Sequence, residues 1–229
     1  MFTHYKNDSI RKLVIGFGSL FNGVKLEQYA ENNTTRLITV PLTYSPKEKF
    51  IKRLTEPSSI SDKTRIQISL PRMSFELVGL VYDPTRKLNK GLRQKRHDSE
   101  SNTTSLSYSE VPYNFLFSVN VYTRNLEENL QIMEQILPYF SPEFVVTMKM
   151  NDIQQKVDVP ISIVNTQLTQ EYEGDFSTRR FIVSTYQFLA KSYIFGRIDT
   201  GYQIENVDMN IFGFIDSAGI TLTSFGLTG

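Results

Sequence analysis

The first periodic stretch of the sequence is helical. Its apolar residues return every three or four positions and so share one helix face: Ile10, Leu13, Val14, Phe17, Leu20 and Phe21. Asp8 or Ser9 can cap the start, because a short polar side chain accepts hydrogen bonds from the first backbone N–H groups. Asn22-Gly23 is typical of a helix end. The pattern predicts an amphipathic helix that packs on the core.

Residues 37–44 alternate as a strand does when one of its faces is buried. Four side chains share that face: Ile38, Val40, Leu42 and Tyr44. Pro41 lacks an N–H donor, which predicts a weak or edge position. Ser45-Pro46-Lys47-Glu48 then has the capping-box pattern, with Pro at the first helical position. A short helix through Leu54 is expected.

A long hairpin is predicted in the middle of the chain. Residues 65–82 alternate in two phases that meet at Leu70-Pro71, which indicates a long strand bent or bulged at that point. Residues 113–123 alternate again and suit antiparallel pairing with residues 73–82. The polar residues 83–110 between them break the pattern, so we expect a long, mobile loop at the hairpin tip.

A second helix follows from Asn125, with Glu127 and Glu128 at the positive end of its dipole. Its expected buried stripe is regular: Leu126, Leu130, Met133, Ile136 and Leu137. Pro138 is expected to end the helix.

The last third of the chain is rich in strand-forming residues. Four segments have this composition: 144–150, 157–164, 181–195 and 207–215. The order of elements predicts an α+β fold, in which two or three helices pack on a mainly antiparallel β-sheet that includes the long hairpin. We find no boundary or repeat, so residues 1–229 are expected to form a single domain.

Composition excludes several classes of protein. The chain has 229 residues and 40% hydrophobic content, enough for a sizeable core. It has no cysteine, which excludes disulfides and thiol chemistry, and its net charge of +1 provides no general attraction to nucleic acid or membranes. The apolar stretch from Leu13 to Phe21 is too short to span a bilayer. Lys6, Arg11 and Lys12 precede it as in a signal peptide, but no cleavage site follows, so a helix is favoured.

The sequence contains no recognisable catalytic, cofactor or metal site. Its two histidines, His4 and His97, lie in a terminal segment and in the polar loop. Gly16-Phe17-Gly18 resembles the start of a dinucleotide-binding fingerprint, but Phe21 occupies the position of the third glycine, so helix packing is the better interpretation. The acidic residues near Glu171 lack the spacing of a calcium loop. We therefore expect no enzyme, no cofactor and no bound metal.

Positive charge is concentrated in one segment of the predicted loop. Residues 86–97 hold six of the chain's 25 basic residues and none of its 24 acidic ones. The six are Arg86, Lys87, Lys90, Arg93, Lys95 and Arg96. They are candidates for contacts with DNA phosphates or with a protein. The alternative is a solvated tip that keeps the hairpin from aggregating, and it is favoured because no aromatic residue is interleaved to stack on bases.

Several blocks of sequence resemble the tail sheath stabilisation and completion protein of T-even-like contractile-tailed bacteriophages. They are Val40 to Phe50, Leu70 to Phe75, Tyr82 to Asn89, Val121 to Asn125, Glu134 to Phe144 and Ser177 to Arg180. Together they extend the resemblance over residues 1 to about 195, and the Leu-Pro-Tyr-Phe-x-Pro block is the most specific. The motif positions are Pro41, Tyr44, Lys47, Pro71, Arg72, Leu137, Pro138, Tyr139, Phe140 and Pro142.

The resemblance implies a non-enzymatic virion protein at the neck end of the tail. It would form a hexameric ring on the completed tail, hold the last sheath ring extended and present a docking surface to the neck. Its implied partners are its own copies, the sheath protein, the tail terminator or tube, and neck proteins, with transient contact to passing DNA and none to membranes.

Two other functions remain open. A tail terminator or head-tail adaptor would also form a ring but would act mainly on the inner tube. A nucleic-acid-binding module would depend on the basic segment alone and would bind duplex DNA with a steep salt dependence.

Overall fold

The computed structural model describes residues 4–29, 35–55, 69–98, 103–150, 156–171 and 181–202. Its main element is a six-stranded sheet, in the order β3 (Leu42–Tyr44), β4 (Arg72–Tyr82), β7 (Val111–Thr123), β10 (Phe181–Ile194), β9 (Lys156–Glu171) and β8 (Phe144–Lys149). All neighbours in this sheet are antiparallel except β3 and β4, which are parallel. Strand β7 is central because it pairs along its length with both β4 and β10.

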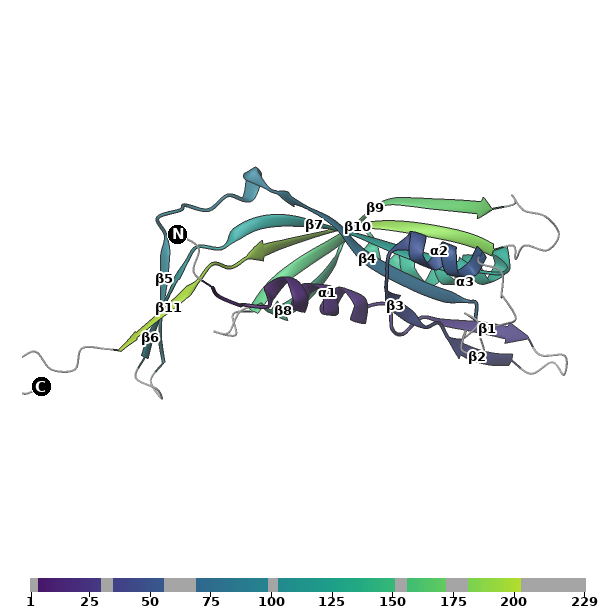
Figure 1. The fold of residues 1–229 in the computed structure, drawn as a ribbon, viewed down its shortest axis with the longest axis horizontal. Helices are drawn as coiled ribbons and strands as arrows, with labels where there is room; N and C mark the ends of the chain where they lie inside the picture. Colours follow the sequence, from purple (N-terminus) through teal and green to yellow (C-terminus); the bar gives the residue numbers. More distant parts are fainter. Residues whose placement is uncertain are drawn as a thin grey trace, which may run out of the picture.

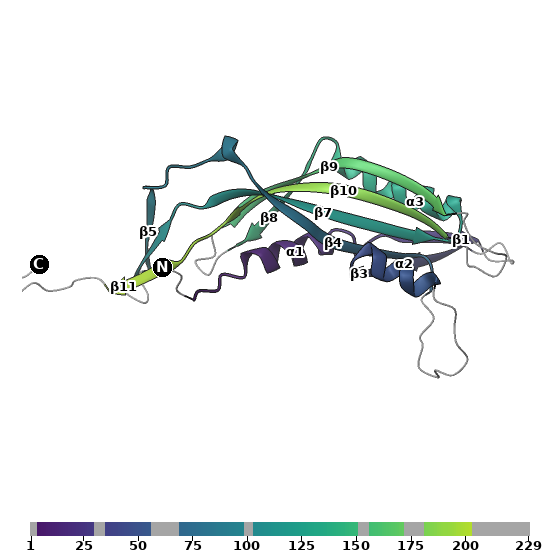
Figure 2. The same ribbon diagram turned by 45° about the horizontal axis from the view of Figure 1, so that its top comes forward.

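Two small sheets lie at opposite ends of the elongated molecule (Figure 1). One is the pair β1 (Lys25–Tyr29) and β2 (Thr35–Thr39), and the other has the order β11 (Ile198–Tyr202), β6 (Thr103–Tyr108) and β5 (Arg93–Asp98). The helices are α1 (Ser9–Ser19), α2 (Lys47–Thr55) and α3 (Leu126–Ile136), with 3-10 turns η1 (Pro84–Arg86) and η2 (Leu137–Phe140). The main sheet is arched, as Figure 2 shows. The predicted α+β class is confirmed.

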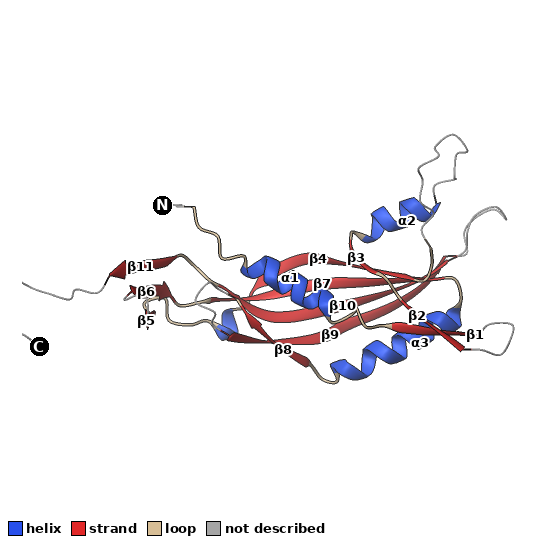
Figure 3. Cartoon of the chain, turned by 90° about the horizontal axis from the view of Figure 1, so that it is seen from below, coloured by secondary structure: helices blue, strands red, loops and turns tan. Residues whose placement is uncertain are grey.

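Helix α1 lies across one face of the main sheet (Figure 3). Its Phe17 ring stacks on Phe117 of β7 with a centroid distance of 4.1 Å and meets Phe188 of β10 edge-on. Gly18 permits this close approach, since a Cβ there would lie 2.5 Å from the Phe75 ring. The interpretation of Gly16-Phe17-Gly18 as a helix-packing motif is therefore confirmed.

The start of α1 differs from the prediction. Asp8 has a positive φ of 52° and makes no side-chain capping bond, although its carbonyl accepts the N–H of Lys12. The segment is held instead by Asn7, whose amide donates to the carbonyls of Phe195 and Gly196. Ile10, expected on the buried face, is 40% exposed.

The predicted strand 37–44 is divided between two sheets. It separates at Val40 and Pro41 into β2 and β3, since the N–H of Val40 bonds to Val24 while the carbonyl of Pro41 accepts from Met73. Strand β3 lies at an edge, as Pro41 predicted. Helix α2 is confirmed. The N–H of Lys47, at the start of the helix, donates to the carboxylate of Glu76, so this helix is capped by a residue of β4.

The predicted hairpin is the antiparallel pair β4 and β7. Its bulge lies between Leu77 and Gly79, not at Leu70-Pro71, where the peptide bond is cis. Residues 65–68 lie outside the described residues. The connection 83–110 is not one long loop, because it contains η1, β5 and β6, and the last two pair with each other.

The strands predicted at 144–150, 157–164 and 181–195 are confirmed as β8, β9 and β10. The segment predicted at 207–215 lies outside the described residues. Strand β11 was not predicted from its sequence, which contains Gly201 and Asp199.

Helix α3 forms where expected, but only part of its predicted stripe faces the core: Ile136 is buried and Met133 packs against the core. Its buried residues are Asn129, Ile132 and Ile136, whereas Leu126, Leu130 and Leu137 are 41%, 45% and 37% exposed. The cause is a buried polar anchor. The Asn129 amide donates to Thr123 of β7 and accepts from Ser184 of β10, and this turns the leucine stripe outward.

The face of α3 can be tested by truncation. We expect Ile132→Ala to lower the free energy of unfolding by about 2–5 kcal/mol, because it leaves a cavity in the core. Leu130→Ala, on the exposed stripe of the same helix, is the matched control and should cost less than about 1 kcal/mol. Urea unfolding followed by circular dichroism measures both, and equal losses would mean that the assigned face is wrong.

Candidate functional site

The first group of motif residues meets where α2 joins the sheet. The Lys47 ammonium donates to the Thr185 hydroxyl of β10 over 3.3 Å. The backbone carbonyl of Lys47 accepts a hydrogen bond from the Tyr122 hydroxyl of β7. Arg72 lies over the Phe50 ring at 5.5 Å and donates to Thr43. The structure thus brings together residues from three separate blocks of sequence.

The remaining members of this group belong to the backbone and the packing. Tyr44 meets Phe75 edge-on at 5.2 Å, the Pro41 carbonyl accepts from Met73, and Pro71 follows the cis bond. Burial raises the pKa of Tyr122 to about 12, so its hydroxyl stays neutral and serves as a hydrogen-bonding group. The α2 corner, defined by these residues together with Lys47 and Arg72, is therefore a structural junction.

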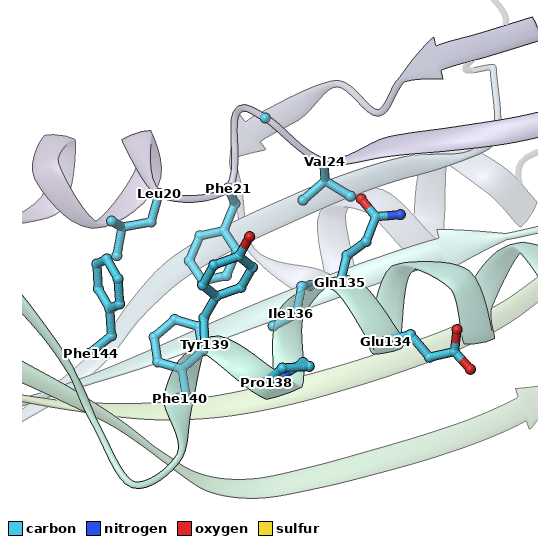
Figure 4. A pocket seen from close by; sticks show the side chains of 11 residues that line it. Leu20, Phe21, Val24, Glu134, Gln135, Ile136, Pro138, Tyr139, Phe140 and Phe144 are labelled. Atoms are coloured by element: carbon cyan, nitrogen blue, oxygen red, sulfur yellow. The ribbon is translucent and has the colours of Figure 1, made fainter.

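A pocket of about 550 Å³ opens beside η2. Figure 4 shows the connection between α1 and β1 on one side of it and the end of α3 with η2 on the other. Its lining is mainly apolar and consists of Leu20, Phe21, Gly23, Val24, Glu134, Gln135, Ile136, Pro138, Tyr139, Phe140 and Phe144. Three residues of the most specific block in the sequence, Pro138, Tyr139 and Phe140, therefore lie in one wall of this pocket.

Two neighbouring aromatic residues of this block have opposite environments. Phe140 is buried against Phe21 and Phe188, which fixes η2 to the core. Tyr139 is 68% exposed. Leu137 and Pro138 are also exposed, and Pro142 follows a second cis bond.

Together with α3, this block exposes several apolar side chains. We name this group the α3–η2 surface and define it by Leu126, Leu130, Leu137, Pro138 and Tyr139. Exposed apolar patches of this kind mark contacts with other proteins. The leucines were identified from the sequence as core residues, and periodicity alone could not show that they remain outside.

The basic segment is divided into two environments. Arg86 is partly buried, pairs with Asp83 at 2.8 Å, donates to Asn114 and lies over the Tyr193 ring. These contacts attach η1 to the main sheet. Hydrogen bonds from Thr85 and Arg86 hold the pKa of Asp83 well below its usual range.

The other five basic residues are exposed. Lys87 and Lys90 precede β5, and Arg93, Lys95 and Arg96 lie on it. Strand β5 is the edge of its sheet, and Arg93 covers the Tyr108 ring at 5.2 Å. Three of these five charges are therefore displayed on a strand rather than on a loop tip.

Within the described ranges, no three His, Cys, Asp or Glu side chains are grouped so that they could hold a metal ion. In the same residues, no helix is long and apolar enough to cross a membrane. The side chains of Glu171, Glu173 and Asp175, and the block Ser177 to Arg180, lie outside the described residues.

The Asp83 contacts predict a pH dependence of stability. Since the folded-state pKa of Asp83 is lowered, the ionised carboxylate stabilises the fold above about pH 4, the ordinary pKa of Asp. This contribution is lost as the pH falls from there toward the lowered value. In thermal unfolding, Asp83→Asn should lower Tm clearly at pH 7 and progressively less below pH 4. Asp199→Asn, beside Arg197 on an exposed strand, is the control, and a Tm difference for Asp83→Asn that is constant with pH would contradict the assignment.

Comparison with known proteins agrees with the motifs. The family model of the T4-like virus Myoviridae tail sheath stabiliser matches residues 4–220. The tail completion protein gp15 of Enterobacteria phage T4 is 31% identical over 208 residues, which cover 87% of this chain and 75% of that protein. Because the match includes both the α2 corner and the α3–η2 surface, the resemblance seen in the sequence is confirmed, and the chain belongs to the tail sheath stabiliser family of T4-like myoviruses.

Proposed function

We propose that this protein caps the head-proximal end of a contractile phage tail as a hexameric ring, holds the last sheath ring extended and provides the docking surface for the neck. The observation that carries the proposal is the family match over residues 4–220. A member of this family is a structural component of the virion tail, and the proposed role requires binding rather than catalysis.

Holding a sheath extended is a problem of differential affinity. A cap shifts the sheath toward its extended state only by binding that state more tightly than the contracted one. A ring also links several contacts in one body, so each contact can be weak while the whole cap remains bound. An apolar surface on every subunit suits such a repeated contact.

The two exposed surfaces support a cap with more than one partner. The α3–η2 surface lies toward the β1–β2 end of the elongated molecule, and the basic edge strand β5 lies at the other end (Figure 1). One is apolar and the other is cationic, so they suit partners of different chemistry. We propose that the α3–η2 surface binds a tail protein.

The α3–η2 surface is tested on tails that lack the protein. Leu130→Asp combined with Tyr139→Ala should leave folding intact, since both side chains are exposed, but should abolish capping by placing a charge in an apolar contact. Electron microscopy should then show contracted or shortened sheaths. Val164→Asp, at an exposed site on β9, is the matched control and should cap normally. Normal capping by the double variant would remove this surface from the proposal.

Binding to tails that lack the protein also distinguishes the proposed sheath cap from a terminator or adaptor that acts on the inner tube. The protein should bind sheathed tails and only weakly bind tubes without sheath. Equal binding to both would favour the terminator role.

For the basic residues we propose weak contact with DNA in transit or with an acidic tail protein. Replacement of Arg93, Lys95 and Arg96 by Ser should leave Tm nearly unchanged, because these side chains are exposed. If DNA is the partner, the intact protein should bind duplex DNA no more tightly than about 10⁻⁴–10⁻⁶ M with strong salt dependence, and the variant more weakly still. Normal tail completion and DNA delivery by the variant would show that the charge only protects the strand edge.

A further inference from the structure

The outer half of β4 is a sheet edge with little protection. Strand β3 pairs with β4 only at residues 73–75, and no described strand pairs with the outer side of residues 77–82. This stretch contains no charged residue and no proline. Four of its side chains are large, apolar and at least 41% exposed: Val78, Leu80, Val81 and Tyr82.

Two other strand edges of the same molecule, those of β1 and β5, are protected. The outer N–H groups of Lys25 and Glu27 on β1 donate to side chains of α3, namely Gln135 and Gln131. Strand β5 carries three cations in six residues. Folded proteins cover or charge their open edges in these ways, because a bare apolar edge pairs with other strands. The outer half of β4 therefore has the character of a surface that another strand covers.

The opposite edge of the main sheet offers a matching strand. The cross-strand pairs can be followed from Leu80 of β4 to the opposite edge. The successive partners, one each on β7, β10, β9 and β8, are Phe115, Ala190, Ile161 and Phe144. The start of β8, at Phe144, thus lies level with Leu80 in the bare half of β4. Four antiparallel pairings separate the two strands, so they run in the same direction.

We propose that the outer half of β4 in one subunit pairs, in parallel, with β8 of the next subunit. The proposal rests on the ring of the proposed function and identifies the contact that closes it. Contact between two different edges is head-to-tail and closes into a ring when the rotation between subunits divides a full turn, whereas pairing of β4 with another β4 would give a two-fold dimer. Backbone hydrogen bonds would continue the sheet across the boundary, and Val81 and Val145, each 52% exposed here, would be covered.

Cysteine cross-linking tests this pairing directly, because the chain has no cysteine of its own. Val81→Cys is combined either with Val145→Cys or with Thr147→Cys. Thr147 is the next residue on the same face of β8, so the second pair detects a pairing shifted by two residues. After oxidation on isolated tails, we expect a ladder of covalent oligomers from one of these pairs. Val81→Cys with Leu168→Cys is the control and should give none, since Leu168 lies level with Met73, where β3 covers β4.

The outcomes are distinguishable. Rings at tail ends without cross-links would overturn the pairing but leave the ring intact. Covalent dimers from Val81→Cys alone would indicate a two-fold contact and also overturn it. Absence of the protein from tail ends would overturn the proposed function together with this inference.

A charge at the same edge provides a second measurement. Val81→Lys should keep the circular dichroism spectrum and Tm of the parent protein but reduce ring assembly about tenfold or more, because a desolvated charge would lie in the strand contact. Leu168→Lys is the matched control and should assemble normally. Equal assembly of both variants would overturn the pairing.

Discussion

The packing of Phe17 against the central strands is the contact on which the rest of the structure depends. Its ring touches Phe117, Phe188 and Phe75, and so joins α1 to β7, β10 and β4 at once. Once α1 is fixed there, the following chain must pass close to η2, and Phe21 reaches Phe140. The pocket beside η2 is the consequence, since its two walls come from segments more than a hundred residues apart in the sequence.

Polar contacts then determine which apolar groups remain outside. Asn129 directs one side of α3 into the sheet, and Gln131 and Gln135 direct a second side onto β1. The third side, with Leu126 and Leu130, has no place left in the core. An apolar surface is therefore available for assembly without any loss of the core, because Ile132 and Ile136 fill it.

The motif residues fall into two groups that make different contacts. They are divided between a junction that holds α2 to the sheet and a surface that faces solvent. Lys47 and Arg72 make intramolecular contacts, whereas Tyr139 projects outward from the buried Phe140. The first group maintains the shape of the subunit, and the second is suited to contact with a partner.

Local sequence determined much of this fold. Alternation identified β7, strand-type composition identified β10, helical spacing located α1 and α3, and Pro41 placed β3 at an edge, because these features depend on neighbouring residues alone. The motifs also indicated the family. Tertiary structure decided the rest. Helix α3 has two apolar stripes, and only hydrogen bonds of Asn129 with Thr123 and Ser184, on strands that are distant in sequence, select the one that is buried. In the same way, Arg86 belongs to a basic run in the sequence but to a partly buried contact in the fold, since Asp83, Asn114 and Tyr193 meet only when the sheet has formed.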